Sequence, residues 1–493
     1  MRILHIDIDS LRPDHLGCYG YHRATSPNID AVAAQGVRFE NVYVSDAPCL
    51  PSRTAMWCGR SGFRSGVVNH GGTAAEPFSE GPQRSWTDVF HDTGWMMCLR
   101  KAGLRTATVS SFAERHAAWH WYAGFNDVMN TGRKGMDVAD EVADQAIEWI
   151  RRFGSSERWF LHVNFWDPHI PYRTPENYGH PFAGEPLPDW MTEDVWRRGW
   201  EGFGPHSPQE PHGYGDETFF LGYPRFPTSI DSMDAVRAWF DGYDTGIRYT
   251  DEHIGHLLNA LDDEGVLEET VITITADHGE NQGELNVWGD HQTADAITCR
   301  VPLIVRWPGI STSPRVDPGL YYQFDWAATT IDLLGEAIPK NWDGRSFADA
   351  FREGRSEGRD YVVFGQCAHA AQRGVRFDAD DTSYLLLVTY HDGYKMVEPV
   401  MLFDIENDPH EQNDLANEHP ELVAHGSALL ETWRREMMLA SDTNVDPLMT
   451  VLREGPLHAS GDLQRYTARL RATGRAHHAE RLEARHPEEM HSA

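Results

Sequence analysis

Short β-forming runs alternate with helical patterns through the first 310 of the 493 residues. The β-forming runs, rich in Val, Ile, Leu, Phe and Thr, span residues 2–9, 105–111, 159–165, 271–276 and 302–307. The helical patterns span residues 26–36, 138–153 and 247–261. Such alternation predicts an α/β fold, in which helices cover both faces of a mostly parallel sheet.

The alternation breaks down inside this region. Residues 170–230 are rich in Pro, Gly and aromatic side chains, and so long an irregular stretch is typical of a functional lid or binding loop. We therefore predict a catalytic α/β domain over residues 1–345, with residues 170–230 as its substrate loop. The aromatic faces favour a carbohydrate or aromatic substrate, the alternative being that they only pack the loop onto the sheet.

The last third of the chain has a different pattern. Two β-forming runs at 361–364 and 384–390 precede a helical stretch at 420–438. This order predicts a smaller subdomain over residues 346–445, built from an antiparallel sheet and a packed helix. The remaining residues, 446–493, form a tail with one charged, amphipathic helical pattern.

Charge and hydropathy narrow the function classes. Acidic residues outnumber basic ones by 75 to 43, giving a formal net charge of −32, so we expect no nucleic-acid partner and no binding to anionic membranes. A polyanionic substrate would require a local basic pocket. No run of about 18 apolar residues occurs, which predicts no membrane-spanning helix. The N-terminus, MRILHIDIDS, lacks the layout of a secretory signal, so we expect a cytoplasmic protein, with a removed leader as the alternative.

Acids and histidines follow three of the predicted strands at their carboxyl ends. The first strand ends in HIDID, and strand alternation puts Asp7 and Asp9 on one side of it. His169 follows the third strand, and Asp277 and His278 follow the fourth. Ligands gather at this edge of an open parallel sheet, and these donors suit a hard or borderline divalent cation. The alternative for any single acid is that it caps a neighbouring helix.

Cys49 stands apart from the other five cysteines, which are scattered and form no CxxC pair. It opens the segment CLPSR, in which Pro51 suits the first turn of a helix and would place Cys49 at the N-cap. The helix N-terminus and Arg53, one turn later, would then face a bound anion. As a plain thiol, Cys49 would be a candidate activated nucleophile, the alternative being a buried structural cysteine.

The CLPSR segment matches the C-x-P-S-R signature of the sulfatase family, within the alkaline phosphatase superfamily, and the chain resembles that family at further points in order. These are the segments DSLRPDHLGCYG at 9–20, SPNID at 26–30, DPH at 167–169, DHGE at 277–280, RVPLIV at 300–305 and LFDIENDP at 402–409. The resemblance implies an alkaline-phosphatase-like fold, with a mixed, mostly parallel sheet between helices and a smaller C-terminal antiparallel sheet.

The resemblance also implies the cofactors and the site. Cys49 is expected to be oxidised by a formylglycine-generating enzyme to formylglycine, whose hydrate attacks sulfur with one hydroxyl and expels sulfate through the other. One divalent ion is expected, calcium ahead of magnesium or manganese. The ligands implied are Asp7, Asp9, Asp277, His278 and the residue at 49. Arg53, His169 and His291 are the further catalytic candidates, and His116 and Trp166 the substrate-binding ones.

Two departures from the family pattern leave the substrate open. Asp9 is followed by Ser10 where many members have a second acid, so Asp7 is expected either to replace it or to lie behind the ligands. The lysines of a GKWH segment and of the region before RVP are missing, and His291 stands near the second position. We predict hydrolysis of a carbohydrate or aryl sulfate monoester, with a phosphonate monoesterase or phosphodiesterase as the alternative and a non-catalytic binding protein as a remoter one. A homo-oligomer is left open.

Overall fold

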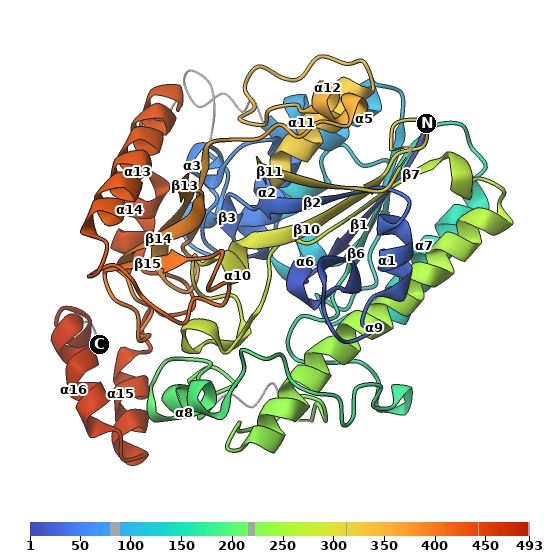
Figure 1. The fold of residues 1–493 in the computed structure, drawn as a ribbon. Helices are drawn as coiled ribbons and strands as arrows, with labels where there is room; N and C mark the ends of the chain where they lie inside the picture. Colours follow the sequence, from blue (N-terminus) through green and yellow to red (C-terminus); the bar gives the residue numbers. More distant parts are fainter. Residues whose placement is uncertain (79–88, 215–221, 312, 442, 492–493) are drawn as a thin grey trace.

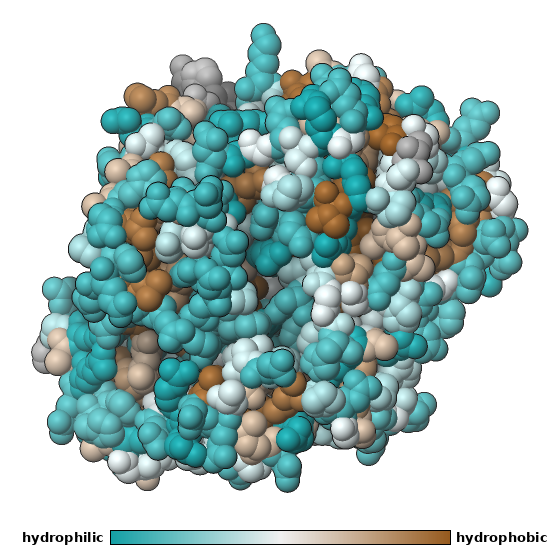
Figure 2. Space-filling view, viewed as in Figure 1, coloured by the Kyte–Doolittle hydropathy of each residue, from teal (hydrophilic) through white to brown (hydrophobic). Residues whose placement is uncertain are grey.

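The computed structural model describes residues 1–78, 89–214, 222–311, 313–441 and 443–491. Positions 215–221 of the predicted substrate loop, including Phe219, lie outside the described residues. Among the described helices, none combines the length and the apolar character needed to cross a bilayer. Figure 2 shows one face of the molecule, on which hydrophilic side chains predominate and apolar ones are scattered.

The larger of the two main sheets has eight strands in the order β11-β2-β10-β7-β1-β6-β4-β5. Their bounds are β1 Arg2–Ile8, β2 Val37–Tyr43, β4 Arg105–Val109, β5 Asp127–Met129, β6 Trp159–Phe165, β7 Thr270–Thr275, β10 Arg300–Arg306 and β11 Arg315–Tyr322. Only β10 runs antiparallel to its neighbours within this sheet. The mixed, mostly parallel sheet is therefore confirmed, and so are the five strands predicted in it.

Helices cover both faces of this sheet (Figure 1). On one face lie α1 (Pro27–Ala33), α7 (Ala139–Phe153) and α9 (Met233–Asp263), and α9 contacts both of the others. On the other lie α2 (Cys49–Cys58), α5 (Trp95–Lys101) and α11 (Gln323–Leu333). The central strands β1, β6 and β7 are buried along almost their whole length, which explains why apolar residues make up most of β1 and β6 and alternate with threonines in β7.

The second sheet has five strands in the order β15-β14-β13-β12-β3. Its bounds are β3 Asp46–Ala47, β12 Tyr361–Gln366, β13 Ala371–Ala379, β14 Thr382–His391 and β15 Val400–Asp404, and α13 (Pro420–Ala440) packs on it. Strands β12 to β15 are antiparallel, as predicted, whereas β3 pairs parallel with β12. The strand just before Cys49 thus joins the N-terminal region to the second sheet, while the boundary at residue 345 stays a prediction.

The substrate loop and the tail pack against each other. The loop is less irregular than predicted, because it contains α8 (Glu193–Glu201). The tail contains α14 (Pro447–Glu454), and its single amphipathic pattern is two helices, α15 (Leu463–Ala472) and α16 (Ala476–Arg485), separated by Gly474 at φ +80°.

A small apolar core holds the tail against the loop. Phe203 and Tyr214 of the loop pack with Tyr466 of α15. Next to this core, buried Glu210 pairs with Arg475 at 3.0 Å. The tail is therefore docked on the loop by both apolar packing and a buried ion pair.

Candidate active site

The carboxyl ends of β1, β6 and β7 bring the predicted acids and histidines together. Asp7 and Asp9 lie on one side of β1, since both carboxylates contact Arg53, at 2.7 and 2.9 Å. Asp277 follows β7, and its Oδ2 lies 2.6 Å from the same guanidinium. Burial is almost complete for all of them, with 3% of Asp7 exposed and 1% or less of the others.

Four side chains have ligand atoms within 4.8 Å of one another, namely Asp9, Cys49, Asp277 and His278. We call these four residues the metal cluster. Nδ1 of His278 lies 2.8 Å from the carbonyl oxygen of Gly279, and its buried Nε2 has no hydrogen-bond partner among the described residues. Asp7 lies outside the cluster. Its Oδ2 pairs with Arg53 and contacts His162, and its Oδ1 has no hydrogen-bond partner in the part of the chain that the structure describes.

The charge balance of the site fits a divalent cation. Three buried carboxylates, Asp7, Asp9 and Asp277, face the single guanidinium of Arg53, which leaves two negative charges uncompensated. Burial and the neighbouring carboxylates accordingly raise the pKa of Asp277 well above its ordinary value, against the effect of Arg53. Burial alone would also raise the pKa of Asp7, but Arg53 and His162 lower it to about 2. A divalent ion bound to the metal cluster would neutralise the excess charge.

Cys49 is the first residue of α2, and the N-cap is Pro48, one position earlier than predicted. The cis Ala47–Pro48 peptide and strand β3 precede it. Its Sγ lies 3.4 Å from Nε2 of His116 and 3.6 Å from Nε2 of His70.

The surroundings of the unmodified thiol disfavour its thiolate form. Burial, together with Asp9 and Asp277, raises the pKa of Cys49 well above its ordinary value. Without a bound cation, this shift favours the alternative of an unreactive buried cysteine over an activated nucleophile, because desolvation and two carboxylates outweigh the helix N-terminus and Arg53.

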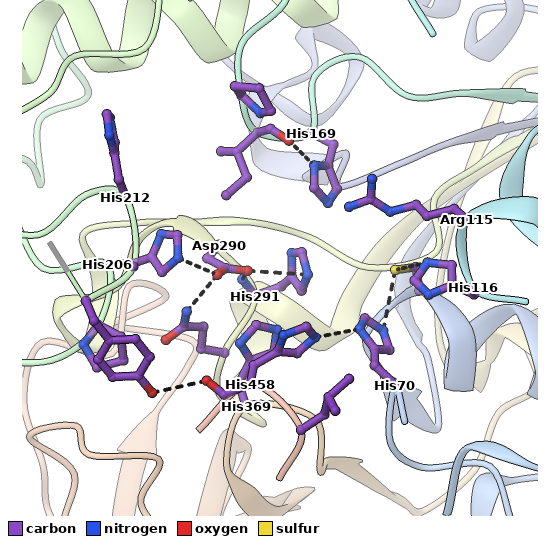
Figure 3. Close-up of a pocket in the computed structure, with 18 of the residues that line it drawn as sticks. His70, Arg115, His116, His169, His206, His212, Asp290, His291, His369 and His458 are labelled. Carbon is purple, nitrogen blue, oxygen red and sulfur yellow. Dashed lines mark hydrogen bonds and ion pairs between the residues drawn. The ribbon is translucent and has the colours of Figure 1, made fainter. Parts of the chain in front are cut away.

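Cys49 contributes to the lining of a cavity of about 1020 Å³, and Figure 3 shows other residues of that lining. His116, His169 and His291 line it, as their predicted roles require, and so do Arg115 and Asp290. Several imidazoles line the cavity, and we call four of them the histidine wall: His70, His291, His369 and His458. Nδ1 of His70 lies 3.0 Å from Nε2 of His458, which stacks on His369 with ring centroids 4.3 Å apart.

His169 and His291 flank the metal cluster. Nε2 of His169 lies 4.0 Å from Asp9, and the ring of His291 lies 4.0 Å from that of His278. Burial lowers the pKa of His169 to about 3 and that of His291 well below its ordinary value. Both imidazoles are therefore neutral at neutral pH in the absence of a bound anion.

Trp166 occupies a different place from the predicted one. It is fully buried and outside the cavity lining, with Arg53 5.7 Å and Arg115 5.3 Å from its ring. This contact supports the two arginines rather than presenting an aromatic face to the cavity.

Several cavity residues had no counterpart in the sequence predictions. Arg115 immediately precedes His116, and this Arg-His pair in the region that departs from GKWH was a usable signal. His70, His369 and His458 come from three distant segments, and nothing in the spacing of 26 histidines distinguishes them.

Comparison with known proteins agrees with this geometry. The family model described as Sulfatase matches residues 2–336, which is more than half of the chain. The chain belongs to the sulfatase family. It is thus an enzyme of the sulfuric ester hydrolase class. A second model, described as N-sulphoglucosamine sulphohydrolase, C-terminal, matches residues 283–434.

Individual relatives span most of this sulfatase. An arylsulfatase of Clostridium perfringens is 25% identical over 461 residues, covering 84% of this chain and 90% of the relative. A structure solved with its substrate D-glucosamine-2-N,6-O-disulfate has a TM-score of 0.69 at 18% identity, covering 91% of this chain and 99% of its own. A phosphonate monoester hydrolase from Silicibacter pomeroyi has a TM-score of 0.67 at 20% identity, with 91% and 97% covered. These two structures share the fold.

Proposed function

We propose that this sulfatase hydrolyses a sulfate monoester of a saccharide, using formylglycine derived from Cys49 and one divalent metal ion held by the metal cluster. The observation that carries the proposal is the convergence of ligand atoms of Cys49, Asp9, Asp277 and His278 within 4.8 Å of one another, with Cys49 in the lining of a large cavity. A decayed binding protein would have no reason to retain both the signature cysteine and a complete buried donor set.

Conversion of Cys49 would supply a hydrated aldehyde, one hydroxyl of which attacks sulfur while the other later expels sulfate. The unmodified thiol is a poor substitute, since burial raises its pKa. His116 and His70 contact the Cys49 side chain and would orient the modified group. Their imidazoles are neutral, because burial lowers both pKa values, so each offers a hydrogen-bond acceptor as well as a donor.

The metal ion would be held by Asp9, Asp277, His278 and the residue at position 49. We expect calcium first, because two of the donors are hard carboxylates. When bound, the ion supplies Lewis-acid stabilisation of the sulfuryl oxygens. Asp7 contributes indirectly, since its carboxylate fixes Arg53 at 2.7 Å. Arg53 in turn keeps a positive charge beside the reacting group throughout the reaction.

His169 and His291 are proposed to protonate the leaving alcohol. Both are neutral in the free protein, and the negative charge of a bound sulfate group would raise their pKa values. Proton uptake would then accompany binding and place an acid beside the leaving oxygen. General acid catalysis of this kind is worth about 10²–10⁴-fold.

The cavity favours a saccharide over a compact alcohol. Its volume of about 1020 Å³ exceeds what one small ester fills. Arg115, Lys134 and Arg465 are cations in its lining, in a protein whose net charge is −32. Supporting evidence comes from the structural neighbour whose solved substrate is a sulfated glucosamine.

The test combines mass analysis with a substrate panel. The peptide containing residue 49 should carry the aldehyde or its hydrate when the protein is made together with a formylglycine-generating enzyme. The converted enzyme should hydrolyse at least one sulfated saccharide faster than phenyl phosphonate esters or phosphodiesters. The opposite preference would favour the phosphonate monoesterase alternative, and no turnover of any ester by converted, metal-loaded protein would overturn the proposal.

A further inference from the structure

A second group of metal-binding side chains lies on the cavity wall, next to the metal cluster. It consists of Asp290 at the end of β9 (Trp288–Asp290), His291 after it, and His369 between β12 and β13. Their ligand atoms all lie within 4.8 Å of one another. All three residues are buried to at least nine-tenths and line the cavity (Figure 3).

The neighbours of Asp290 hold it in place. Oδ1 accepts a hydrogen bond from the backbone N–H of His291 at 2.8 Å, and Oδ2 accepts one from Nε2 of Gln292 at 2.6 Å. Nε2 of His206 lies 3.1 Å from Oδ2. Partners of this kind orient a ligating carboxylate and are typical of metal sites.

The imidazoles of His291 and His369 can each donate a ring-nitrogen lone pair to a cation. Nδ1 of the buried His291 has no hydrogen-bond partner among the described residues. Burial lowers the pKa of His369 well below its ordinary value, so its ring is neutral. Two imidazoles and one carboxylate are the donor set that zinc takes in sites with an open fourth position.

The other candidate away from the cavity is less suitable for a cation. His391, His486 and Glu489 also lie close together, but both ring nitrogens of His486 face carboxylates, at 2.8 Å from Asp392 and 2.9 Å from Glu489. That imidazole is therefore engaged in ion pairs and has no lone pair to offer.

We propose that Asp290, His291 and His369 form a second cation site, selective for a borderline divalent ion such as zinc and separate from the metal cluster. Its consequence rests on the proposed function. An ion on His291 occupies the lone pair that would carry the proton to the leaving alcohol, so zinc inhibits the enzyme at this site. Esters of poor leaving groups are inhibited most, because they depend on that proton.

Binding is tested without turnover. The full-length protein, saturated with calcium, is titrated with zinc by calorimetry, and one zinc ion should bind. His369→Ala should weaken this binding by about tenfold or more, as expected for the loss of one ligand. The matched control is His458→Ala, which removes an imidazole stacked on His369 but outside the donor set and should change zinc affinity by less than about threefold. Circular dichroism of each variant checks folding.

Cobalt provides a second measurement that needs no variant. Cobalt added to the calcium-loaded wild-type protein should give visible ligand-field absorption, and zinc should abolish it. Equal zinc affinity in wild type and His369→Ala, or zinc that excess calcium displaces, would overturn the proposal.

Zinc inhibition then separates the two proposals. Zinc should lower the rate on an alkyl or saccharide sulfate more than on nitrophenyl sulfate, each relative to the zinc-free rate, and His369→Ala should weaken this inhibition. An active enzyme that binds no zinc under excess calcium contradicts only the second site. An inactive protein that binds zinc through His369 contradicts only the proposed function.

Discussion

The metal cluster and the histidine wall face the same cavity but are built differently. The acids of the cluster come from positions just after buried central strands, whose geometry fixes where each side chain lies. The wall is assembled from loops and from the tail, with His70, His369 and His458 nearly 400 residues apart at the extremes. Its position depends on long-range docking, in which Tyr214 of the substrate loop donates a hydrogen bond to the carbonyl of His458.

This difference suggests a division of labour. We expect residues placed by the sheet to carry the chemical step, and residues placed by the loops and the tail to contact the rest of the substrate. Changes in the cluster should therefore abolish turnover, and changes in the wall should alter substrate binding and leaving-group dependence. The predictions that follow test this division.

The largest effect is expected at position 49. Cys49→Ala should lose turnover by on the order of 10⁶, because the nucleophile is removed. Cys49→Ser should perform at most one slow turnover, since a serine sulfate has no second hydroxyl to expel sulfate. Progress curves with excess aryl sulfate, followed by peptide mass analysis, measure both. Sustained turnover by Cys49→Ser near the parent rate would show that the hydrated aldehyde is unnecessary.

The second largest effect is expected at the proposed metal ligands. Exhaustive chelation and Asp277→Asn should each lower turnover by roughly a thousandfold, since a bound ion would contribute several kcal/mol to transition-state stabilisation. Asp7→Asn should cost less, about tenfold, because Asp7 positions Arg53 from outside the metal cluster. Metal content and rates are measured together on each variant. Unchanged turnover after chelation would remove the metal from the mechanism.

His291 belongs to the histidine wall but lies against the metal cluster. Its substitution therefore tests whether a wall residue next to the cluster takes part in the chemical step. His291→Ala should lower rates on saccharide sulfates by about 10²–10⁴-fold and affect nitrophenyl sulfate little, because a nitrophenolate leaves without a proton. Parallel kinetics on the two substrate types make the comparison. Equal losses on both would assign His291 to binding alone.

A residue of the histidine wall that does not contact the metal cluster should have a smaller effect, and this effect should appear in KM. His458→Ala removes the partner of His70 at 3.0 Å and should raise KM by roughly tenfold with kcat within about threefold of wild type. Steady-state kinetics on the preferred saccharide give the split. A loss mainly in kcat would show that the histidine wall takes part in the chemical step, and the proposed difference in role between the metal cluster and the wall would then be wrong.

The smallest effect concerns the docking of the tail. Burial alone would lower the pKa of His486, but hydrogen bonds to Asp392 and Glu489 raise it from 6.5 to about 9. Its contribution to docking is therefore fully present below pH 6.5 and lost as pH rises through 9. Limited proteolysis of the tail should accelerate over this range, with a flatter profile in His486→Gln. A pH-independent cleavage rate in wild type would show that the ion pairs of His486 do not hold the tail in place.

The pattern of β-forming residues alone was sufficient to predict the central strands of the larger sheet. β1, β6 and β7 are rich in β-forming residues because both of their faces are buried, so their ends, and the acids at or after those ends, could be located. β2 and β11 were missed for local reasons: Arg38, Glu40 and Asn41 interrupt the apolar pattern of β2, and Pro318 and Gly319 lie inside β11, where the pairing register shifts.

The candidate site divides in the same way. Asp9, Asp277, His278 and Cys49 were predicted together, and the structure brings them together, although their roles stay proposals. His70, His369 and His458 could not be predicted as cavity residues, because no local sequence pattern indicates which loops meet across a cavity. Trp166 is the reverse case. It was predicted to bind substrate, but its ring lies against Arg53 and Arg115 and outside the cavity lining, and the sequence does not determine which way that ring faces.

Helix α2 has one more consequence. Every residue from Cys49 to Cys58 is buried, and Cys49 itself is only 1% exposed, with β3 holding the preceding segment in the second sheet. The proposed function requires this side chain to be oxidised by a second enzyme, which must bind the segment around Cys49 in an active site of its own. An enzyme that needs this segment in an extended form would have to act before β12 pairs with β3. The converted fraction of a preparation would then depend on the relative rates of modification and folding.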